Sequence, residues 1–160
     1  MKQLTLIRHA KAVHGSPDID RALSPRGISQ ARWLGTELWT QAFSFDALFS
    51  SNARRTLETA AYLCEELGLP EDTVKAESDL YSFDVNDLYR YIGRINEQIN
   101  HAVIVGHNPA IHGLAQDLTG AVLDKVPTCT FLHIALDIDY WLEAGAGSGD
   151  LVEWYYPPRS

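Results

Sequence analysis

The sequence predicts an α/β fold: a three-layer sandwich in which helices flank a mainly parallel central sheet, formed as one domain over residues 1–160. Short apolar runs that suit buried strands alternate along the chain with longer segments whose apolar residues recur at helical spacing. The length of 160 residues and the apolar fraction of 46% are typical of one globular domain. Alternating strands and helices favour a parallel sheet and allow an antiparallel strand at one edge.

The elements of the first half follow from their apolar runs and their caps. A buried strand is expected at 4–7, where the residues are Leu-Thr-Leu-Ile, and a second strand at 46–50. Ser24 followed by Pro25 predicts the start of a helix, because serine caps free N–H groups and proline suits the first helical position. A second helix is expected from about Ala53 and ends where a glycine and a proline follow.

The second half continues this pattern and then changes. A helix is expected over 88–99, where apolar residues recur at helical spacing. The β-branched run at 102–105 predicts a strand, and the Asn-Pro pair after it predicts another helix up to residue 118. The C-terminal quarter predicts two further strands, 130–137 and 151–156, which a glycine-rich segment joins.

Charge and composition exclude several classes of function. Thirteen Lys and Arg residues against 21 Asp and Glu residues give a net charge of −8. This balance argues against a nucleic-acid partner, because neutralising a phosphate backbone requires a basic face. Arg8 interrupts the N-terminal apolar run, which is too short for a signal peptide or a membrane span. We therefore expect a cytoplasmic protein with no membrane partner.

The two cysteines, Cys64 and Cys129, match neither a zinc-ligand spacing nor a disulfide framework. Cys64 falls on the apolar stripe of a predicted helix, and Cys129 begins a predicted strand. We expect both to be reduced core residues, with a disulfide between them as the alternative.

Two histidines occupy equivalent positions, each directly after a predicted strand. His9 follows the first strand, and His107 follows the strand at 102–105 and precedes a helix start. In open α/β sheets, ligands bind outside the carboxyl ends of the strands, where helix N-termini favour anions. A lone histidine after a strand is usually a surface residue, but two in equivalent places with Arg8 beside one predict an anion site.

The junction from Ser50 to Thr56 carries two arginines at the start of a predicted helix. Arg54 is expected to pair with Glu58 one helical turn later. Arg55 lies one step further round the helix and is expected to point over the sheet edge. The remaining histidines lack a supporting motif and are expected to be structural or exposed; they are His14, His101, His112 and His133.

Three segments, in this order along the chain, carry a family resemblance. They are Leu6-Ile7-Arg8-His9-Ala10-Lys11-Ala12, Ser51 to Arg55 with Thr59, and Val105-Gly106-His107-Asn108-Pro109. They resemble the histidine phosphatase (phosphoglycerate-mutase-like) superfamily, with Arg-His-Ala in place of the usual Arg-His-Gly. The short chain and the segment at 20–27 look most like its small bacterial phosphohistidine phosphatase (SixA-like) subgroup. The resemblance runs from Met1 to about Gly120.

The resemblance implies a phosphoglycerate-mutase-like fold and a covalent mechanism. His9 would be the nucleophile that takes up the phosphoryl group as phosphohistidine, and a neutral imidazole is a competent nucleophile near pH 7. Arg8, Arg55 and His107 would surround the phosphoryl oxygens, so no metal ion or other cofactor is implied. Arg21 either contacts the phosphate at the rim or pairs only with the aspartates beside it.

Many superfamily members that cleave ordinary phosphate esters use a carboxylic acid to protonate the leaving alkoxide. The corresponding interval offers Glu77, Asp79 and Asp84, of which Asp79 is the first candidate for a general acid. Asp84 can instead cap the next helix, and Glu77 can end a short strand. Without a clear acid, we expect phosphohistidine and activated esters to be better substrates than alkyl phosphates, because imidazole departs easily.

The 51 residues between Arg55 and His107 leave no room for a large lid, so an open site that admits a side chain of another protein is expected. We therefore predict a metal-independent phosphatase whose substrate is phosphohistidine on a phosphorylated protein. The alternatives are a phosphomonoesterase that acts on a small phosphorylated metabolite, and a non-catalytic module that binds a phospho-ligand. A phosphoglycerate mutase is disfavoured, because the short chain has little with which to retain a substrate through two transfers.

Overall fold

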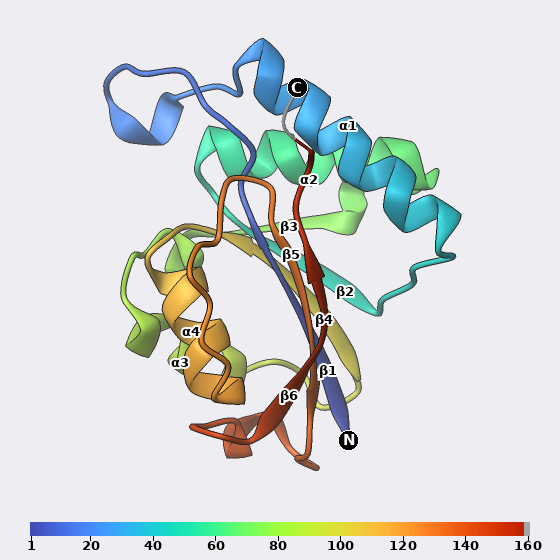
Figure 1. The fold of residues 1–160 in the computed structure, drawn as a ribbon, viewed down its shortest axis with the longest axis vertical. Coiled ribbons are helices and arrows are strands. Elements are labelled where there is room, and N and C mark those ends of the chain that lie inside the picture. Colours follow the sequence, from blue (N-terminus) through green and yellow to red (C-terminus); the bar gives the residue numbers. More distant parts are fainter. Residues whose placement is uncertain (159–160) are drawn as a thin grey trace.

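A six-stranded sheet runs through the centre of the molecule (Figure 1), of which the computed structural model describes residues 1–158. The strand order is β3-β2-β4-β1-β5-β6. β1, β2, β3 and β4 run parallel, whereas β5 and β6 are antiparallel to their neighbours. The strands are β1 (Lys2–Arg8), β2 (Ala47–Ser51), β3 (Val74–Glu77), β4 (His101–Gly106), β5 (Phe131–Leu136) and β6 (Gly149–Tyr155).

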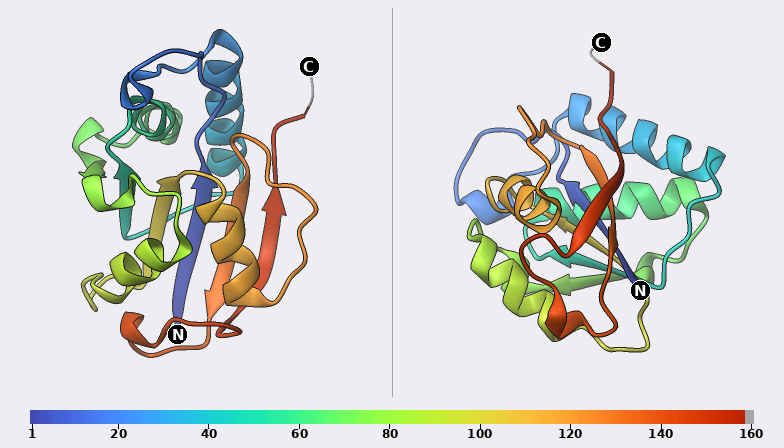
Figure 2. Two further views of the ribbon diagram at one scale, coloured as in Figure 1. Left: turned by 90° about the vertical axis from the view of Figure 1, so that its left-hand side faces the viewer. Right: turned by 60° about the horizontal axis from the view of Figure 1, so that its bottom comes forward.

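Four α-helices in the described part of the chain cover the sheet, with one pair on each face. α1 and α2 pack on one face, and α3 and α4 pack on the other (Figure 2). The helices are α1 (Pro25–Thr40), α2 (Arg54–Leu67), α3 (Val85–Gly93) and α4 (Ala110–Thr119). The predicted three-layer sandwich is confirmed. None of these helices combines the length and the apolar character that a membrane span requires.

The alternation of side chains along the central strands divides the core in two. Leu4 and Leu6 of β1 are buried in the cluster under α3 and α4. Ile7, one residue later, belongs to the cluster under α1 and α2, together with Val103 and Val105 of β4. Both faces of β1 and β4 are therefore covered, which explains why these strands read as continuous apolar runs in the sequence.

Local sequence determines the helix ends. The Ser24 hydroxyl caps α1, and Pro25 occupies its first turn, as predicted. Asp84 caps α3 by accepting a hydrogen bond from the backbone N–H of Asn86 at 2.8 Å. α2 ends at Gly68, whose φ of 69° lies in the left-handed region that glycine adopts without strain.

Most strand ends shift by one or two residues from the sequence prediction, and three other boundaries also differ. α3 ends at Gly93 rather than near residue 99, and α4 begins at Ala110, with Pro109 as its N-cap. Cys129 does not begin a strand: it lies in the turn before β5, with a φ of 64°. Its N–H donates to the carbonyls of Arg8 and His9, so a contact distant in sequence determines this turn. As predicted, Cys64 and Cys129 are buried and unpaired.

Gly27 lies where α1 contacts the loop that follows β1. A Cβ atom at this position would lie 1.9 Å from the carbonyl oxygen of Lys11, which accepts a hydrogen bond from the backbone N–H of Ser24. We expect Gly27→Ala to lower the free energy of unfolding by about 3 kcal/mol, because two backbone segments must move apart. Urea denaturation measures this loss.

The matched control is Gly145→Ala, whose Cβ would lie 3.9 Å from the carbonyl oxygen of Glu143, an ordinary van der Waals distance. Gly145 has no positive φ, so alanine fits there, and we expect a change within about 0.5 kcal/mol. Equal effects of the two substitutions would contradict the predicted clash at Gly27.

Candidate active site

The two histidines singled out in the sequence meet at the carboxyl ends of β1 and β4. These strands pair in parallel, with Arg8 opposite Gly106, so the residues that follow them emerge side by side. The ring centroids of His9 and His107 lie 5.4 Å apart. Arg55 enters from the first turn of α2, which follows the neighbouring strand β2. The parallel topology therefore brings three distant segments into one site.

Backbone and side-chain contacts hold His9 in one orientation. Its N–H donates to the carbonyl of Gly106 at 3.0 Å, and the next N–H, that of Ala10, donates to the Thr59 hydroxyl at 3.0 Å. The ring Nδ1 lies 2.7 Å from the carbonyl oxygen of Ala10. A carbonyl only accepts hydrogen bonds, so Nδ1 carries the proton and Nε2 carries the free lone pair.

The surroundings of His9 keep its ring neutral. Burial lowers the pKa of His9 to about 4, and the positive charges of Arg55 and Arg8 act in the same direction. The hydrogen bond to Ala10 opposes this shift without reversing it. A neutral imidazole with a lone pair on Nε2 is the form that can attack phosphorus.

This lowered pKa can be measured directly. The neutral ring takes up a proton only when the pH falls through the lowered pKa, so we expect the His9 ring to stay neutral from pH 8 down to about pH 5.5. NMR signals of the His9 ring, assigned by their loss in His9→Gln, should stay constant over this interval, in which a histidine in a short peptide titrates. A midpoint near the ordinary value of about 6.5 would contradict the burial argument.

Arg55 is 2% exposed and bonded on both terminal nitrogens. Nη1 donates to the carbonyl oxygen of Asp18 at 2.9 Å, and Nη2 donates to Asp18 Oδ2 at 3.0 Å. Nη2 also lies 3.2 Å from Nδ1 of His107. Its neighbour Arg54 points outward and pairs with Glu58 at 3.1 Å, as the sequence predicted. The two adjacent arginines therefore have separate environments.

His107 is buried and held by a hydroxyl and a guanidinium. A guanidinium has only donors, so Nδ1 of His107 accepts from Arg55, and Nε2 donates to the Ser51 hydroxyl at 2.8 Å. Burial, reinforced by the charge of Arg55, lowers the pKa of His107 to about 3. The rings of Tyr81 and Phe83 pack against it, with centroids at 5.4 and 5.2 Å.

Arg8 and Arg55 retain donors that no described residue accepts. Nη1 of Arg8 donates to the carbonyl of Val126 at 2.9 Å, but Nε of Arg8 and Nε of Arg55 are buried without a partner in residues 1–158. Two arginines with spare N–H groups near the unprotonated Nε2 of His9 suit a ligand with several negatively charged oxygens. Over the same residues, no group of three or more His, Cys, Asp or Glu side chains is placed to hold a metal ion.

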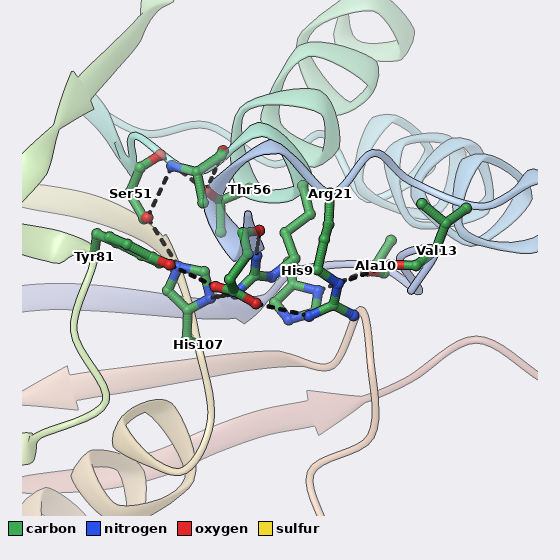
Figure 3. A network of polar contacts seen from close by, with 11 residues as sticks. His9, Ala10, Val13, Arg21, Ser51, Thr56, Tyr81 and His107 are labelled. Carbon is green, nitrogen blue, oxygen red and sulfur yellow. Dashed lines mark hydrogen bonds and ion pairs between the residues drawn. The ribbon is translucent and has the colours of Figure 1, made fainter. Parts of the chain in front are cut away.

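Asp18 is a site residue that the sequence analysis did not identify. Its Oδ2 accepts from the Tyr81 hydroxyl at 2.5 Å and from Arg55 at 3.0 Å, and its Oδ1 accepts from Arg21 at 3.0 Å. Figure 3 shows Tyr81, His107 and Arg21 converging on this polar network. The bond from Tyr81, followed by those from the arginines, holds the pKa of Asp18 well below its usual range. The only signal in the sequence was the proximity of Arg21.

The other candidate residues lie outside this network or at its rim. Arg21 pairs with Asp18 and donates to the carbonyl of Val13 at 2.8 Å. The carboxylate of Asp79 is 67% exposed and pairs with Arg94 at 3.0 Å. Asp84 caps α3, and Glu77 ends β3. Asp79, the predicted general acid, therefore pairs with Arg94 and has no hydrogen bond to His9 or His107 in the described chain.

A family model and a curated relative match this chain. A family model described as "Histidine phosphatase superfamily (branch 1)" matches residues 4–89. An uncharacterized protein from Mycobacterium leprae is 29% identical over 168 residues, which cover 94% of this chain and 99% of that protein.

Solved structures share the fold. The protein histidine phosphatase SixA complexed with tungstate matches with a TM-score of 0.80 at 20% identity, covering 96% of both chains. A mycobacterial glucosyl-3-phosphoglycerate phosphatase matches with a TM-score of 0.72 at 16% identity, covering 98% of this chain and 99% of that chain. The family model spans more than half of the sequence and includes His9, which follows β1, and Arg55 at the start of α2. This chain belongs to the histidine phosphatase superfamily.

Proposed function

We propose that this protein is a metal-independent phosphatase that works through a phosphohistidine formed on His9. Nε2 of His9 attacks phosphorus, the bond from phosphorus to the leaving group breaks, and water then cleaves the phosphohistidine to release phosphate. The observation that carries this proposal is the geometry of His9. Its proton is held on Nδ1 by the Ala10 carbonyl at 2.7 Å, so its lone pair is on Nε2, close to the buried Arg55 and the half-buried Arg8.

Three side chains support the transfer in this mechanism. Arg8 and Arg55 donate to the phosphoryl oxygens through the N–H groups that no described residue accepts. His107, whose ring centroid lies 5.4 Å from that of His9, accepts from Nη2 of Arg55 at Nδ1 and so helps to orient this arginine. Most of the rate acceleration in phosphoryl transfer comes from positioning and electrostatic stabilisation, and the two preorganised arginines supply both.

The contacts of the candidate acids indicate which kind of leaving group the site can release. Asp79 is engaged by Arg94 and Asp84 by the N-terminus of α3, and neither bonds to the histidine pair in the described chain. A site without a proton donor suits leaving groups that depart without one. Imidazole is such a leaving group, so we propose phosphohistidine on a protein as the substrate. The fold shared with the protein histidine phosphatase SixA supports this choice.

A small phosphorylated metabolite is the second candidate substrate. The fold is also shared with a glucosyl-3-phosphoglycerate phosphatase, with a TM-score of 0.72, and this observation favours the alternative. The two candidates differ in the leaving group: a metabolite ester releases an alkoxide, which needs a proton, whereas phosphohistidine releases an imidazole.

The test compares three substrates in the presence of a chelator. They are a protein phosphorylated on histidine, p-nitrophenyl phosphate and glycerol phosphate. We expect kcat/KM for the first two to exceed that for glycerol phosphate by about 100-fold or more, because general acid catalysis contributes about that factor. Comparable kcat/KM for glycerol phosphate would favour the metabolite alternative, and loss of all activity with the chelator would contradict metal independence.

A further inference from the structure

Asp18 lies beside the phosphoryl pocket, and the mechanism above assigns it no role. We propose that its carboxylate accepts a hydrogen bond from the distal N–H of an imidazole leaving group, so that this residue selects phosphorylated imidazole rings. The inference rests on the proposed function, because it requires phosphoryl transfer to His9.

The carboxylate of Asp18 is firmly held but has capacity for another donor. Oδ2 is occupied by the Tyr81 hydroxyl and by Nη2 of Arg55. Oδ1 accepts only from Arg21, at 3.0 Å, among the described residues. A carboxylate oxygen accepts two hydrogen bonds, and the Asp18 side chain is 45% exposed, so Oδ1 can bind a donor that arrives from solvent.

An aromatic wall next to Asp18 fits a flat ring. Tyr81 and Phe83 lie 5.8 Å apart between ring centroids, and both pack against His107. The Tyr81 hydroxyl bonds to Asp18, and the Phe83 side chain is 48% exposed. A flat cation can bind here in two ways: its charge is attracted to the carboxylate, and its face stacks on the exposed aromatic ring. A protonated imidazole has these properties, and an alkyl group has neither.

The chemistry explains why a bound N–H matters. In the reactive substrate, one ring nitrogen is bonded to phosphorus and the distal nitrogen carries a proton, so the ring is an imidazolium. Nε2 of His9 forms a new bond to phosphorus as the substrate P–N bond breaks, and the electron pair of that bond stays on the departing nitrogen. The ring leaves as neutral imidazole and keeps its distal proton. Without that proton it would have to leave as the imidazolate anion.

Asp18 therefore favours departure without transferring a proton. A carboxylate that accepts from the distal N–H stabilises the imidazolium form of the substrate and raises its population in the bound state. This role needs an acceptor that is always ionised, and the three donors around Asp18 keep it so. It also explains how a site in which no candidate acid contacts the histidine pair can still cleave a P–N bond.

The test changes the charge and keeps the shape. Asp18→Asn is compared with the native protein on N-phosphoimidazole and on p-nitrophenyl phosphate, at about pH 8, where a free imidazole is largely neutral. We expect the ratio of the two kcat/KM values, N-phosphoimidazole over p-nitrophenyl phosphate, to fall about tenfold. An effect that acts through Arg55 lowers kcat/KM for both substrates and cancels in the ratio. The loss of the N–H bond falls on N-phosphoimidazole alone, because nitrophenolate has no N–H for Asp18 to bind.

The matched control is Asp20→Asn, in the same short turn as Asp18 and exposed, for which we expect an unchanged ratio. Calorimetric binding of inorganic phosphate shows that each variant retains a folded pocket. Asp18→Ser, which also removes the charge, replaces Asp18→Asn if the latter does not fold.

Two results would overturn the inference, and they are distinguishable. If Asp18 only orients Arg55, both substrates lose activity by similar factors, and the ratio falls by less than about threefold. If the native protein does not cleave N-phosphoimidazole through His9, the proposed function fails first and this inference fails with it. A ratio that falls by about threefold or more, with the Asp20→Asn ratio unchanged, supports the selection of imidazole by Asp18.

Discussion

His9→Ala should lower kcat by about 10⁴-fold or more, because it removes the atom that forms the covalent intermediate. Rapid-quench labelling with a labelled phosphoramidate, in the presence of a chelator, measures this step. We expect the native protein to form a phosphoenzyme that is labile in acid and stable in base, as a phosphohistidine is. The variant should form none.

The matched control is His14→Ala, since His14 is an exposed histidine in the loop that follows His9. It should keep both the label and the turnover. Turnover that survives His9→Ala would show that the nucleophile has been misassigned. A native protein that binds phosphate but never becomes labelled would favour the phospho-ligand binding module.

Arg55→Lys should lower kcat/KM by about 10³-fold although it keeps the positive charge. A lysine ammonium is a single point of donation, whereas the guanidinium of Arg55 bonds to Asp18 through two nitrogens and to His107. Lysine therefore cannot hold this geometry and also donate to the phosphoryl group. Steady-state kinetics with p-nitrophenyl phosphate measure the loss, and calorimetry with inorganic phosphate shows how much of it is binding.

Arg54→Lys is the natural comparison, because Arg54 precedes Arg55 on the same helical turn and pairs outward with Glu58. An exposed pair of this kind contributes less than about 1 kcal/mol to stability, so the kinetics should stay within about twofold of the native protein. Equal losses from the two substitutions would mean that helix α2, rather than the Arg55 side chain, determines the activity.

Much of the fold and the centre of the site could be predicted because the signals are local. The apolar runs of β1 and β4 identify buried parallel strands, and parallel strands end at one edge of the sheet. His9 and His107 follow these two strands directly, so their proximity needed no knowledge of side-chain packing. Arg55 was distinguishable from Arg54 by its place on the helix.

The role of Asp18 depends on long-range contacts, which the spacing of residues along the sequence does not predict. It lies 37 residues from Arg55 and 63 residues from Tyr81, in a loop whose path is determined by tertiary packing. Cys129 shows the same limit. Its position before an apolar run favours a strand, yet the backbone of the β1 end, at Arg8 and His9, holds it in a left-handed turn. Backbone contacts between distant segments override local preference there.

The position of β1 in the strand order has a consequence for how this protein can change. β1 is paired on both sides, with β4 and β5, and buried on both faces, so the segment that carries His9 belongs to the part of the protein that opens last in local unfolding. Asp18 and Arg21 lie on a loop outside the sheet, where substitutions disturb little packing. Selection can therefore alter what the pocket accepts while the reacting atom stays in place.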